Sequence, residues 1–135
     1  MADIDTMEYI TFASLGNSAD FGNLAEATNY GIGAAGDGTK GLWGGGQNGA
    51  GSQTDAIQYV NMDSLGNTTD FGDLSDDRMY VTACGDGTKC VFGGGVKGAG
   101  IVNILEYVNF ASTGNVTDFG DLNASPYGIM AASGD

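Results

Sequence analysis

Residues 7–24, "MEYITFASLGNSADFGNL", return twice along the chain. The second copy is "IQYVNMDSLGNTTDFGDL" at 57–74, and the third is "LEYVNFASTGNVTDFGDL" at 105–122. A period of about fifty residues is typical of a repeat architecture such as a solenoid, a propeller or an array. The repeat therefore decides the fold class before any single motif does.

A second segment repeats with the same period. "YGIGAAGDGTKGLWGGG" at 30–46 returns as "YVTACGDGTKCVFGGG" at 80–95, and a shortened copy, "YGIMAASGD", occupies 127–135. Small apolar residues precede the "GDGT" turn, and a hydrophobic run that ends in three glycines follows it. Asp-Gly between apolar runs is a strong hairpin signal, so this segment predicts two short strands.

The first segment predicts two further strands. Tyr9-Ile10-Thr11-Phe12 is rich in β-branched and aromatic residues, which favour strands. A Gly-Asn turn then leads into "DFGNL" or "DFGDL", and no window keeps a 3.6-residue period. We therefore expect an all-β chain with four antiparallel strands in each repeat.

Two details favour propeller blades over a β-sandwich. Ile10 and Phe12 lie on one face of the first strand and Tyr9 on the other, as expected of a blade packed between two neighbours. The strand of small residues suits the innermost position, where strands crowd around an axis. Four short strands in about fifty residues match one blade.

The order of these runs resembles the kelch repeat. A small apolar strand, a strand ending in "VFGGG" and a strand carrying "EYV" follow one another as in kelch. Phe21, Phe71 and Phe119 stand where kelch has Trp, and three glycines stand where it has two. The segment "EYVNFASTGNVTDFGDL" is similar in sequence to kelch-like repeats in tail-fibre-like virion proteins of marine and cyanobacterial tailed phages. The resemblance implies a propeller fold and a virion component.

In the kelch register the chain, 1–135, is one repeat domain. It holds a half-blade (7–24), two blades (30–74 and 80–122) and a C-terminal innermost strand (127–135). These make about two and three-quarter blades, whereas a closed propeller has about four to eight. We therefore expect a homo-oligomer, with a dimer favoured.

In such a dimer the C-terminal strand of one chain would complete the half-blade of the other, at a joint that lacks the second strand. A contact that does not close would give a filament instead.

The composition excludes several partners. The chain has 4 Lys and Arg against 17 Asp and Glu, a net charge of −13 and no His. Such a charge predicts no binding to nucleic acid or to anionic membrane surfaces. The missing His removes the commonest general base. The start "MADIDTMEYI" shows no secretory signal, and no run approaches the roughly 18 apolar residues of a membrane span. We expect synthesis in a (host) cytoplasm and no membrane insertion.

The stretch "CGDGTKCVFGGG" at 84–95 contains both cysteines. It is neither a C-x-x-C redox motif nor a P-loop, since "GDGTK" lies between two strands. Cys84 and Cys90 flank the hairpin turn, so a disulfide across it is one alternative. Free structural thiols, which suit a reducing compartment, are the other.

The best metal candidates are acidic residues of the repeated turn and outer strand. Their oxygens could bind calcium, and they are Asp20, Asp70, Asp73, Asp118 and Asp121. Together with Asn17, Asn23, Asn67 and Asn115 they form three sets with three-residue intervals. The alternative is turn capping and a solvated rim, and Asp76-Asp77 is interpreted as a solvated loop. No other cofactor is expected.

Aromatic residues are the candidates for ligand binding. Trp43, Tyr30, Tyr80 and Tyr127 could stack on sugars of a host surface glycan. Because Trp43 aligns with Phe92, packing in a blade core is the competing interpretation.

The resemblance implies a non-enzymatic virion protein that acts in assembly or host attachment. It would be a tail-fibre, appendage or decoration component, located in the virion, and its partners would be its own copies and other virion proteins. A glycan-binding propeller lectin and a self-assembling filament protein remain alternatives. An enzyme is not expected, because no His and no convergent acid pair is present.

Overall fold

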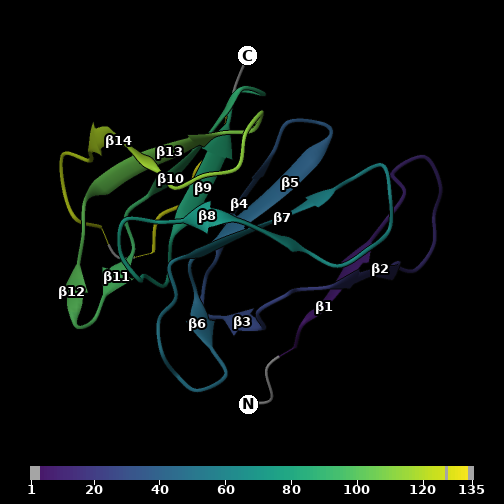
Figure 1. Cartoon of the computed structure of the whole chain (residues 1–135), viewed down its shortest axis with the longest axis horizontal. Helices are drawn as coiled ribbons and strands as arrows, with labels where there is room; N and C mark the ends of the chain where they lie inside the picture. The colour runs from purple at the N-terminus through teal and green to yellow at the C-terminus, as the bar shows by residue number, and fades with distance from the viewer. Residues whose placement is uncertain (1–3, 127, 134–135) are drawn as a thin grey trace.

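The chain is all-β in a computed structural model that describes residues 4–126 and 128–133. Its N-terminal hairpin pairs β1 (Thr6–Tyr9) with β2 (Ala19–Asn23). Two four-stranded antiparallel sheets follow along the chain (Figure 1). The first sheet contains β4 (Gly33–Gly36), β5 (Lys40–Gly44), β7 (Ala56–Asn61) and β8 (Thr69–Asp73). The second contains β9 (Thr82–Gly85), β10 (Lys89–Gly93), β13 (Ile104–Asn109) and β14 (Thr117–Asp121).

Both sheets have the same topology. Their strand orders are β4-β5-β7-β8 and β9-β10-β13-β14, so each strand pairs with the next long strand of its repeat. They lie within the ranges 30–74 and 80–122 that the repeat predicts. Two short pairs outside them were not expected from the sequence. These pairs are β3 (Thr28–Asn29) with β6 (Gln47–Asn48), and β11 (Val96–Lys97) with β12 (Gly100–Ile101).

Aspartate side chains build the tight turns between the first two strands of each sheet. Oδ1 of Asp37 accepts hydrogen bonds from the backbone N–H groups of Thr39 (2.7 Å) and Lys40 (2.6 Å). Oδ1 of Asp86 does the same in the second sheet, at 2.8 and 2.7 Å. This local capping is what favours Asp in such turns, so the repeated "GDGT" motif is structural.

A β-bulge marks the outermost strand of each unit. The register of β7 with β8 passes from Ile57↔Gly72 to Gln58↔Asp70, which leaves Phe71 as the extra residue. A bulge re-aims the residues around it, and here the Phe71 carbonyl accepts a hydrogen bond from the backbone N–H of Gly114 at 2.7 Å. The same bulge occurs in the hairpin and in β13–β14.

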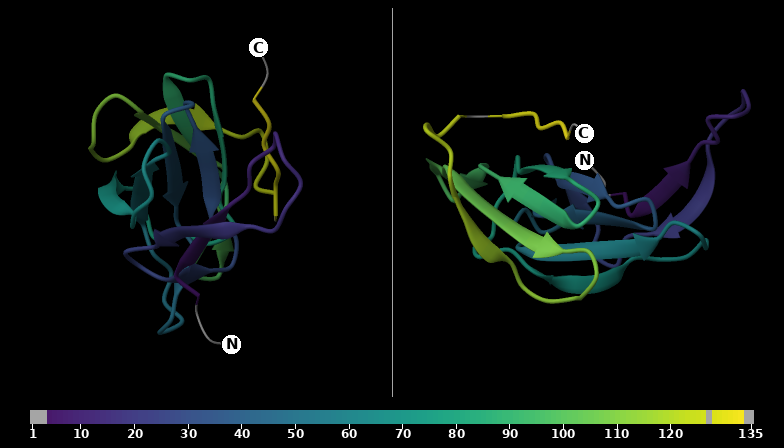
Figure 2. Two further views of the ribbon diagram at one scale, coloured as in Figure 1. Left: turned by 90° about the vertical axis from the view of Figure 1, so that its right-hand side faces the viewer. Right: turned by 90° about the horizontal axis from the view of Figure 1, so that it is seen from above.

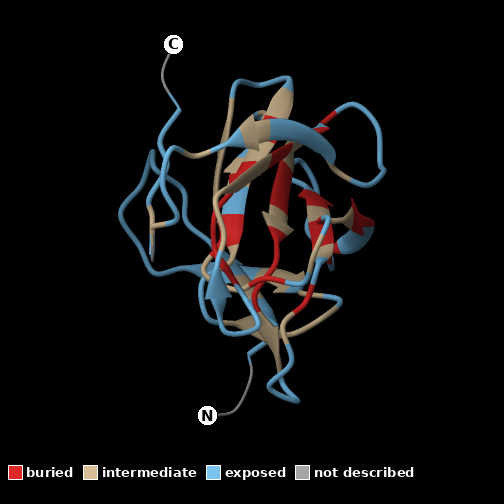
Figure 3. Ribbon diagram, turned by 90° about the vertical axis from the view of Figure 1, so that its left-hand side faces the viewer, coloured by how far each residue is buried: buried red, intermediate tan, exposed pale blue. Residues whose placement is uncertain are grey.

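The hydrophobic core lies between the two four-stranded sheets. The first sheet contributes Leu42, Ile57 and Phe71, which are 0–2% exposed. The second contributes Phe92 and Phe110, which are 0–1% exposed, with other buried side chains around them. Figure 3 shows buried stretches in red on strands in the middle of the molecule, whereas most of the loops are exposed. Apolar burial of this kind is the main stabilising contribution to the fold.

The N-terminal hairpin packs on the other face of the first sheet. Met7, Tyr9 and Phe21 of the hairpin face Trp43 and Val60 of the sheet across a small cavity. The right-hand view of Figure 2 shows the hairpin and the last strands at opposite ends of the molecule. The first sheet is therefore covered on both faces, as expected of a blade packed between two neighbours.

The C-terminal segment differs from the sequence-based expectation of a strand over 127–135. Residues 128–133 form no strand, and Tyr127 and residues 134–135 lie outside the described residues. The segment still lies beside the second sheet, because Ile129 Cδ1 would be 2.9 Å from a Cβ placed on Gly94. No strand within residues 4–126 pairs with it.

The burial of Phe71 predicts a large loss of stability when the side chain is truncated. Phe71→Ala should lower the free energy of unfolding by roughly 3–5 kcal/mol, because it opens a cavity between the sheets. Urea denaturation followed by Trp43 fluorescence measures this change. Leu65→Ala, at a side chain that is 64% exposed, is the matched control and should change stability by less than about 0.5 kcal/mol. Equal effects of the two changes would contradict the placement of Phe71.

Candidate functional site

Apolar side chains remain exposed at the two ends of the stacked sheets. On the hairpin, Ile10 is 58% and Phe12 is 98% exposed. Their repeat equivalents in the second sheet, Val108 and Phe110, are 4% and 1% exposed. We call the surface of Ile10, Phe12 and the adjoining loop 16–18 the hairpin face. Its side chains are apolar like their buried repeat equivalents, but no other part of the described residues covers them.

The opposite end shows the same contrast. Phe119 is 56% exposed, whereas its repeat equivalent Phe71 is 2% exposed. Phe119 packs edge-to-face on Tyr107 with 5.9 Å between ring centroids, and a cavity of about 360 Å³ opens between Phe119, Leu105 and Ile129. We call the surface of Leu105, Tyr107, Phe119 and the outer edge of β14 the β14 face. Exposed apolar patches of this kind mark interaction sites.

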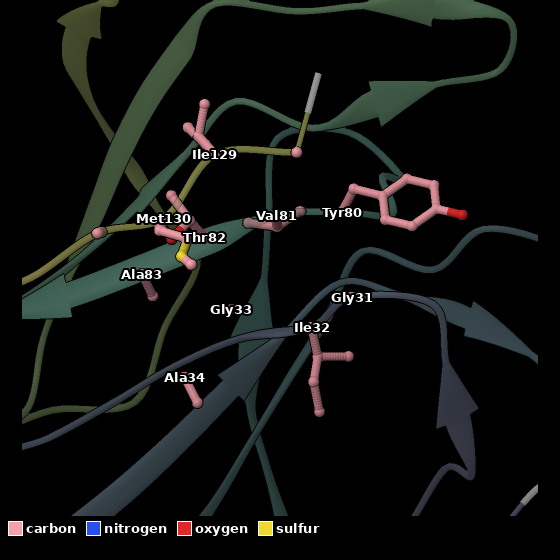
Figure 4. A pocket seen from close by; sticks show the side chains of 12 residues that line it. Gly31, Ile32, Gly33, Ala34, Tyr80, Val81, Thr82, Ala83, Ile129 and Met130 are labelled. Carbon is pink, nitrogen blue, oxygen red and sulfur yellow. The ribbon is translucent and has the colours of Figure 1, made fainter. Parts of the chain in front are cut away.

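The structure brings Tyr30 and Tyr80 together. Their rings meet edge-to-face with 6.3 Å between centroids, and each residue has a φ of 57°. Such a backbone conformation is uncommon for a bulky side chain and costs free energy. Tyr80 lines a cavity of about 470 Å³ between β4, β9 and residues 128–131 (Figure 4), while Tyr30 is 49% exposed. Small and apolar residues make up the rest of the lining.

Trp43 does not join this pair. Trp43 is half-buried and lies between β5 and the hairpin, where it lines a separate cavity of about 190 Å³. This placement matches the packing alternative for Trp43. Tyr127 lies outside the described residues.

The candidate calcium ligands lie on three separate outer strands. Asp20 is on β2, Asp70 and Asp73 are on β8, and Asp118 and Asp121 are on β14. Burial raises the pKa of the Asp73 carboxyl above its ordinary value, and the charges of Asp55 and Asp70 add to this shift. Among residues 4–126 and 128–133, no three His, Cys, Asp or Glu side chains lie close enough together to hold a metal ion.

The asparagines of the same repeated turn join neighbouring units. Asn67 Oδ1 accepts a hydrogen bond from the backbone N–H of Asn23 at 3.0 Å. Asn115 Oδ1 accepts one from the backbone N–H of Asp73 at 3.1 Å. Capping therefore describes their role, although it reaches across to the neighbouring unit rather than acting within the turn.

The disulfide alternative is corrected by the strand register. Both cysteines are free thiols. Cys84 pairs with Val91, and Cys90 pairs with Gly85, so the two side chains point to opposite faces of the sheet. Cys90 lies in the core, where burial raises the pKa of its thiol to about 12, with a smaller contribution from Cys84. A thiol that stays protonated in this way is a poor nucleophile.

A buried ion pair was not expected from the sequence. Arg78, the single Arg of the chain, is 0% exposed and donates a hydrogen bond from Nη2 to the carboxylate of Glu106, which is 1% exposed. Its Nη1 donates to the Gly94 carbonyl at 3.0 Å. Burial lowers the pKa of the Arg78 guanidinium, and the charge of Asp76 opposes this shift. The recurrence of Glu8, Gln58 and Glu106 at one repeat position was the available signal.

Comparison with known proteins does not add to this geometry. No protein-family model matches the chain, and no curated protein is detectably similar to it. In the described part of the chain, no helix is long and apolar enough to cross a membrane.

The buried ion pair predicts a strong effect of removing one partner. Arg78→Ala should destabilise the protein by roughly 3–5 kcal/mol, because it leaves the Glu106 carboxylate buried and unpaired. The matched control is Lys97→Ala, which breaks the exposed pair of Lys97 with Asp76 and should cost under about 1 kcal/mol. Thermal and urea unfolding of both variants measure the difference. If both variants lose a similar amount of unfolding free energy, the buried pair contributes no more to stability than the exposed one.

The turn aspartates predict how stability depends on pH. Backbone hydrogen bonds, from Lys40 first for Asp37 and from Lys89 first for Asp86, hold both carboxyl pKa values below the ordinary 3.8. The stabilisation is therefore fully present above that pKa and is lost as the pH falls through the lowered values. In Asp37→Asn/Asp86→Asn, the free energy of unfolding should fall less steeply between about pH 5 and pH 2.

Urea midpoints measured across this range test the expectation. Asp63→Asn, at an exposed residue that accepts no hydrogen bond within residues 4–126 and 128–133, is the control. If the free energy of unfolding of the double variant falls as steeply at low pH as that of the wild type, the two turn aspartates do not contribute to the pH dependence.

Proposed function

We propose that this protein is a non-enzymatic structural component of a larger assembly, built from kelch-like propeller blades that come together by self-association. The observation that carries the proposal is the pair of open apolar faces at opposite ends of the stacked sheets. Phe12 is 98% and Phe119 is 56% exposed, although their repeat equivalents Phe110 and Phe71 are core residues. A chain with both ends open is suited to serve as one segment of a ring or fibre.

The resemblance to phage virion repeats suggests where such an assembly works. A tail-fibre, appendage or decoration protein in a virion would contact its own copies and other virion proteins. The net charge of −13 suits a component that must stay soluble until it assembles.

The use of the polar side chains supports a structural role over catalysis. Asp37 and Asp86 hold turns, Asn67 and Asn115 join neighbouring units, and Glu106 holds the buried arginine. The carboxyl groups among them would otherwise be candidates for acid–base catalysis. Within the described residues, the hydrogen bonds of these side chains stabilise the fold.

Glycan binding is the second candidate function, and the tyrosine pair favours it. Tyr80 lines the cavity between β4 and β9, its ring packs edge-to-face on the exposed ring of Tyr30, and both residues have strained backbone conformations. Strain of this kind clusters at ligand sites, and aromatic rings offer apolar faces on which a sugar can stack.

Self-association predicts a solution mass above that of the 13.7 kDa chain. Light scattering after size exclusion should give a discrete dimer, with roughly six blades in a closed ring. Because every copy carries the same net charge of −13, salt should strengthen the association by screening their repulsion. A monomer at all protein and salt concentrations would contradict the proposal, and a ladder of large species would favour an open filament over a ring.

The glycan alternative is tested separately. A glycan array probed with the wild-type protein and with Tyr30→Ala should show binding that the variant loses, while its solution mass stays unchanged. Leu65→Ala is the control at another exposed side chain. An array without any signal would remove the alternative and leave the structural role as it stands.

A further inference from the structure

The contact between neighbouring units is made twice within the chain, with the same atoms. The first instance joins the hairpin to the first sheet, and the second joins the first sheet to the second. In both, the bulged outer strand of one unit meets the turn between the last two strands of the next. The two instances give a template for a third.

Backbone hydrogen bonds repeat in this template. Gly66 N–H donates to the Phe21 carbonyl at 2.8 Å, and Gly114 N–H donates to the Phe71 carbonyl at 2.7 Å. A second pair, Thr68 N–H to the Asn23 carbonyl and Val116 N–H to the Asp73 carbonyl, measures 2.9 and 3.0 Å. Equal bonds in both instances mean that the register between neighbours is fixed.

Side chains repeat in the same way. Asn67 and Asn115 each accept from a backbone N–H of the preceding outer strand. Gln58 Oε1 accepts from the backbone N–H of Ala25 at 2.8 Å, and Glu106 Oε2 accepts from that of Ser75 at 3.3 Å. The third member of this repeat position is Glu8, on the hairpin.

The bulge glycines show how closely neighbours approach. A Cβ placed on Gly22 would lie 2.2 Å from the Gly66 carbonyl oxygen, and one placed on Gly72 would lie 2.2 Å from that of Gly114. Gly120, at the same place in β14, has nothing within 4 Å. The outer edge of β14 therefore has the same bulge as β2 and β8, but no turn of a following unit packs against its glycine.

The hairpin presents the matching half. Its loop carries Gly16, Asn17 and Ser18, which are the repeat equivalents of Gly66, Asn67 and Thr68. All three are exposed, and their backbone N–H groups have no hydrogen-bond partner in residues 4–126 or 128–133. Ile10 is exposed beside them, where Val60 and Val108 are 6% and 4% exposed under a neighbouring unit.

We propose that the hairpin face of one copy docks on the β14 face of a second copy in this same register. Gly16 and Ser18 N–H donate to the Phe119 and Asp121 carbonyls of the other copy, and Asn17 Oδ1 accepts from its Asp121 N–H. Ile10 and Phe12 cover its exposed aromatic residues. The inference rests on the self-association proposed above and names its two surfaces and their register.

The two contacts within the chain indicate that the partner of each face is a second copy of the same chain. Each face already meets its complement within this chain at equivalent repeat positions, so a second copy supplies the outer-strand donors, acceptors and apolar side chains of the contact. The hairpin itself has no counterpart of β10, which adds Cys90 and Phe92 to the contact between the two sheets. The contact is heterologous, because the two faces differ, and so it leads to a ring or to an open fibre.

Two single variants and their mixture test the register. Ile10→Asp on the hairpin face and Phe119→Asp on the β14 face should each weaken self-association roughly a hundredfold or more, because each buries an unpaired carboxylate. Leu15→Asp is the matched control. Its repeat equivalent Leu65 stays 64% exposed beside a formed contact, so this change should leave the oligomer as it is.

The mixture identifies a heterologous contact. Ile10→Asp keeps an intact β14 face and Phe119→Asp keeps an intact hairpin face, so a 1:1 mixture should form a heterodimer and nothing larger. Circular dichroism and thermal unfolding check that each variant folds. If Phe119→Asp does not fold, Phe119→Ala takes its place, and Asn17→Ala serves as a second hairpin-face variant.

The outcomes separate this inference from the proposed function. A wild-type protein that stays monomeric overturns the self-association itself. A wild-type oligomer that survives both variants, or a mixture that stays monomeric, overturns the register while self-association stands. Loss of the oligomer in Leu15→Asp as well would also overturn the register, because the contact would then cover a different surface.

Discussion

The contact between neighbouring sheets is the constraint on which the rest of the structure depends. The bulge at Phe71 turns its side chain into the core and its carbonyl toward Gly114 of the next unit. Gly72 lets that carbonyl-to-backbone approach occur, since any Cβ there would lie 2.2 Å from the Gly114 oxygen. Apolar burial and a fixed register thus come from one local feature, and each unit is stable only against a neighbour.

Several motifs that look chemical serve the fold of each sheet or this contact. The Asp-Gly turns set the spacing of the first two strands, the asparagines tie one outer strand to the next turn, and the buried pair of Arg78 and Glu106 fixes the loop between sheets. Repetition explains why. Apart from the single Arg78, these side chains recur from unit to unit, as expected of groups that build each unit and its joint with the next.

The candidate site was only partly predictable. The tyrosines at 30 and 80 were identified from their recurrence, but their ring contact depends on β4 and β9 lying side by side. The cysteines six positions apart appeared able to pair, and the register places them on opposite faces. The buried arginine was missed because a lone basic residue in a loop carries no periodic signal. In each case the deciding distance lies between segments that are not neighbours in the sequence.

The sequence by itself determined the all-β class, the four strands of each repeat and the turns that join them, because strand period, Asp-Gly turns and small-residue runs act locally. It also showed the repeat, and with it the expectation that units stack. Only the tertiary structure decided which face of each strand is covered. Ile10 and Val108, or Phe119 and Phe71, are equivalent by sequence, yet one member of each pair is exposed and the other is buried. Burial depends on whether a neighbouring sheet is present, and no residue encodes that for itself.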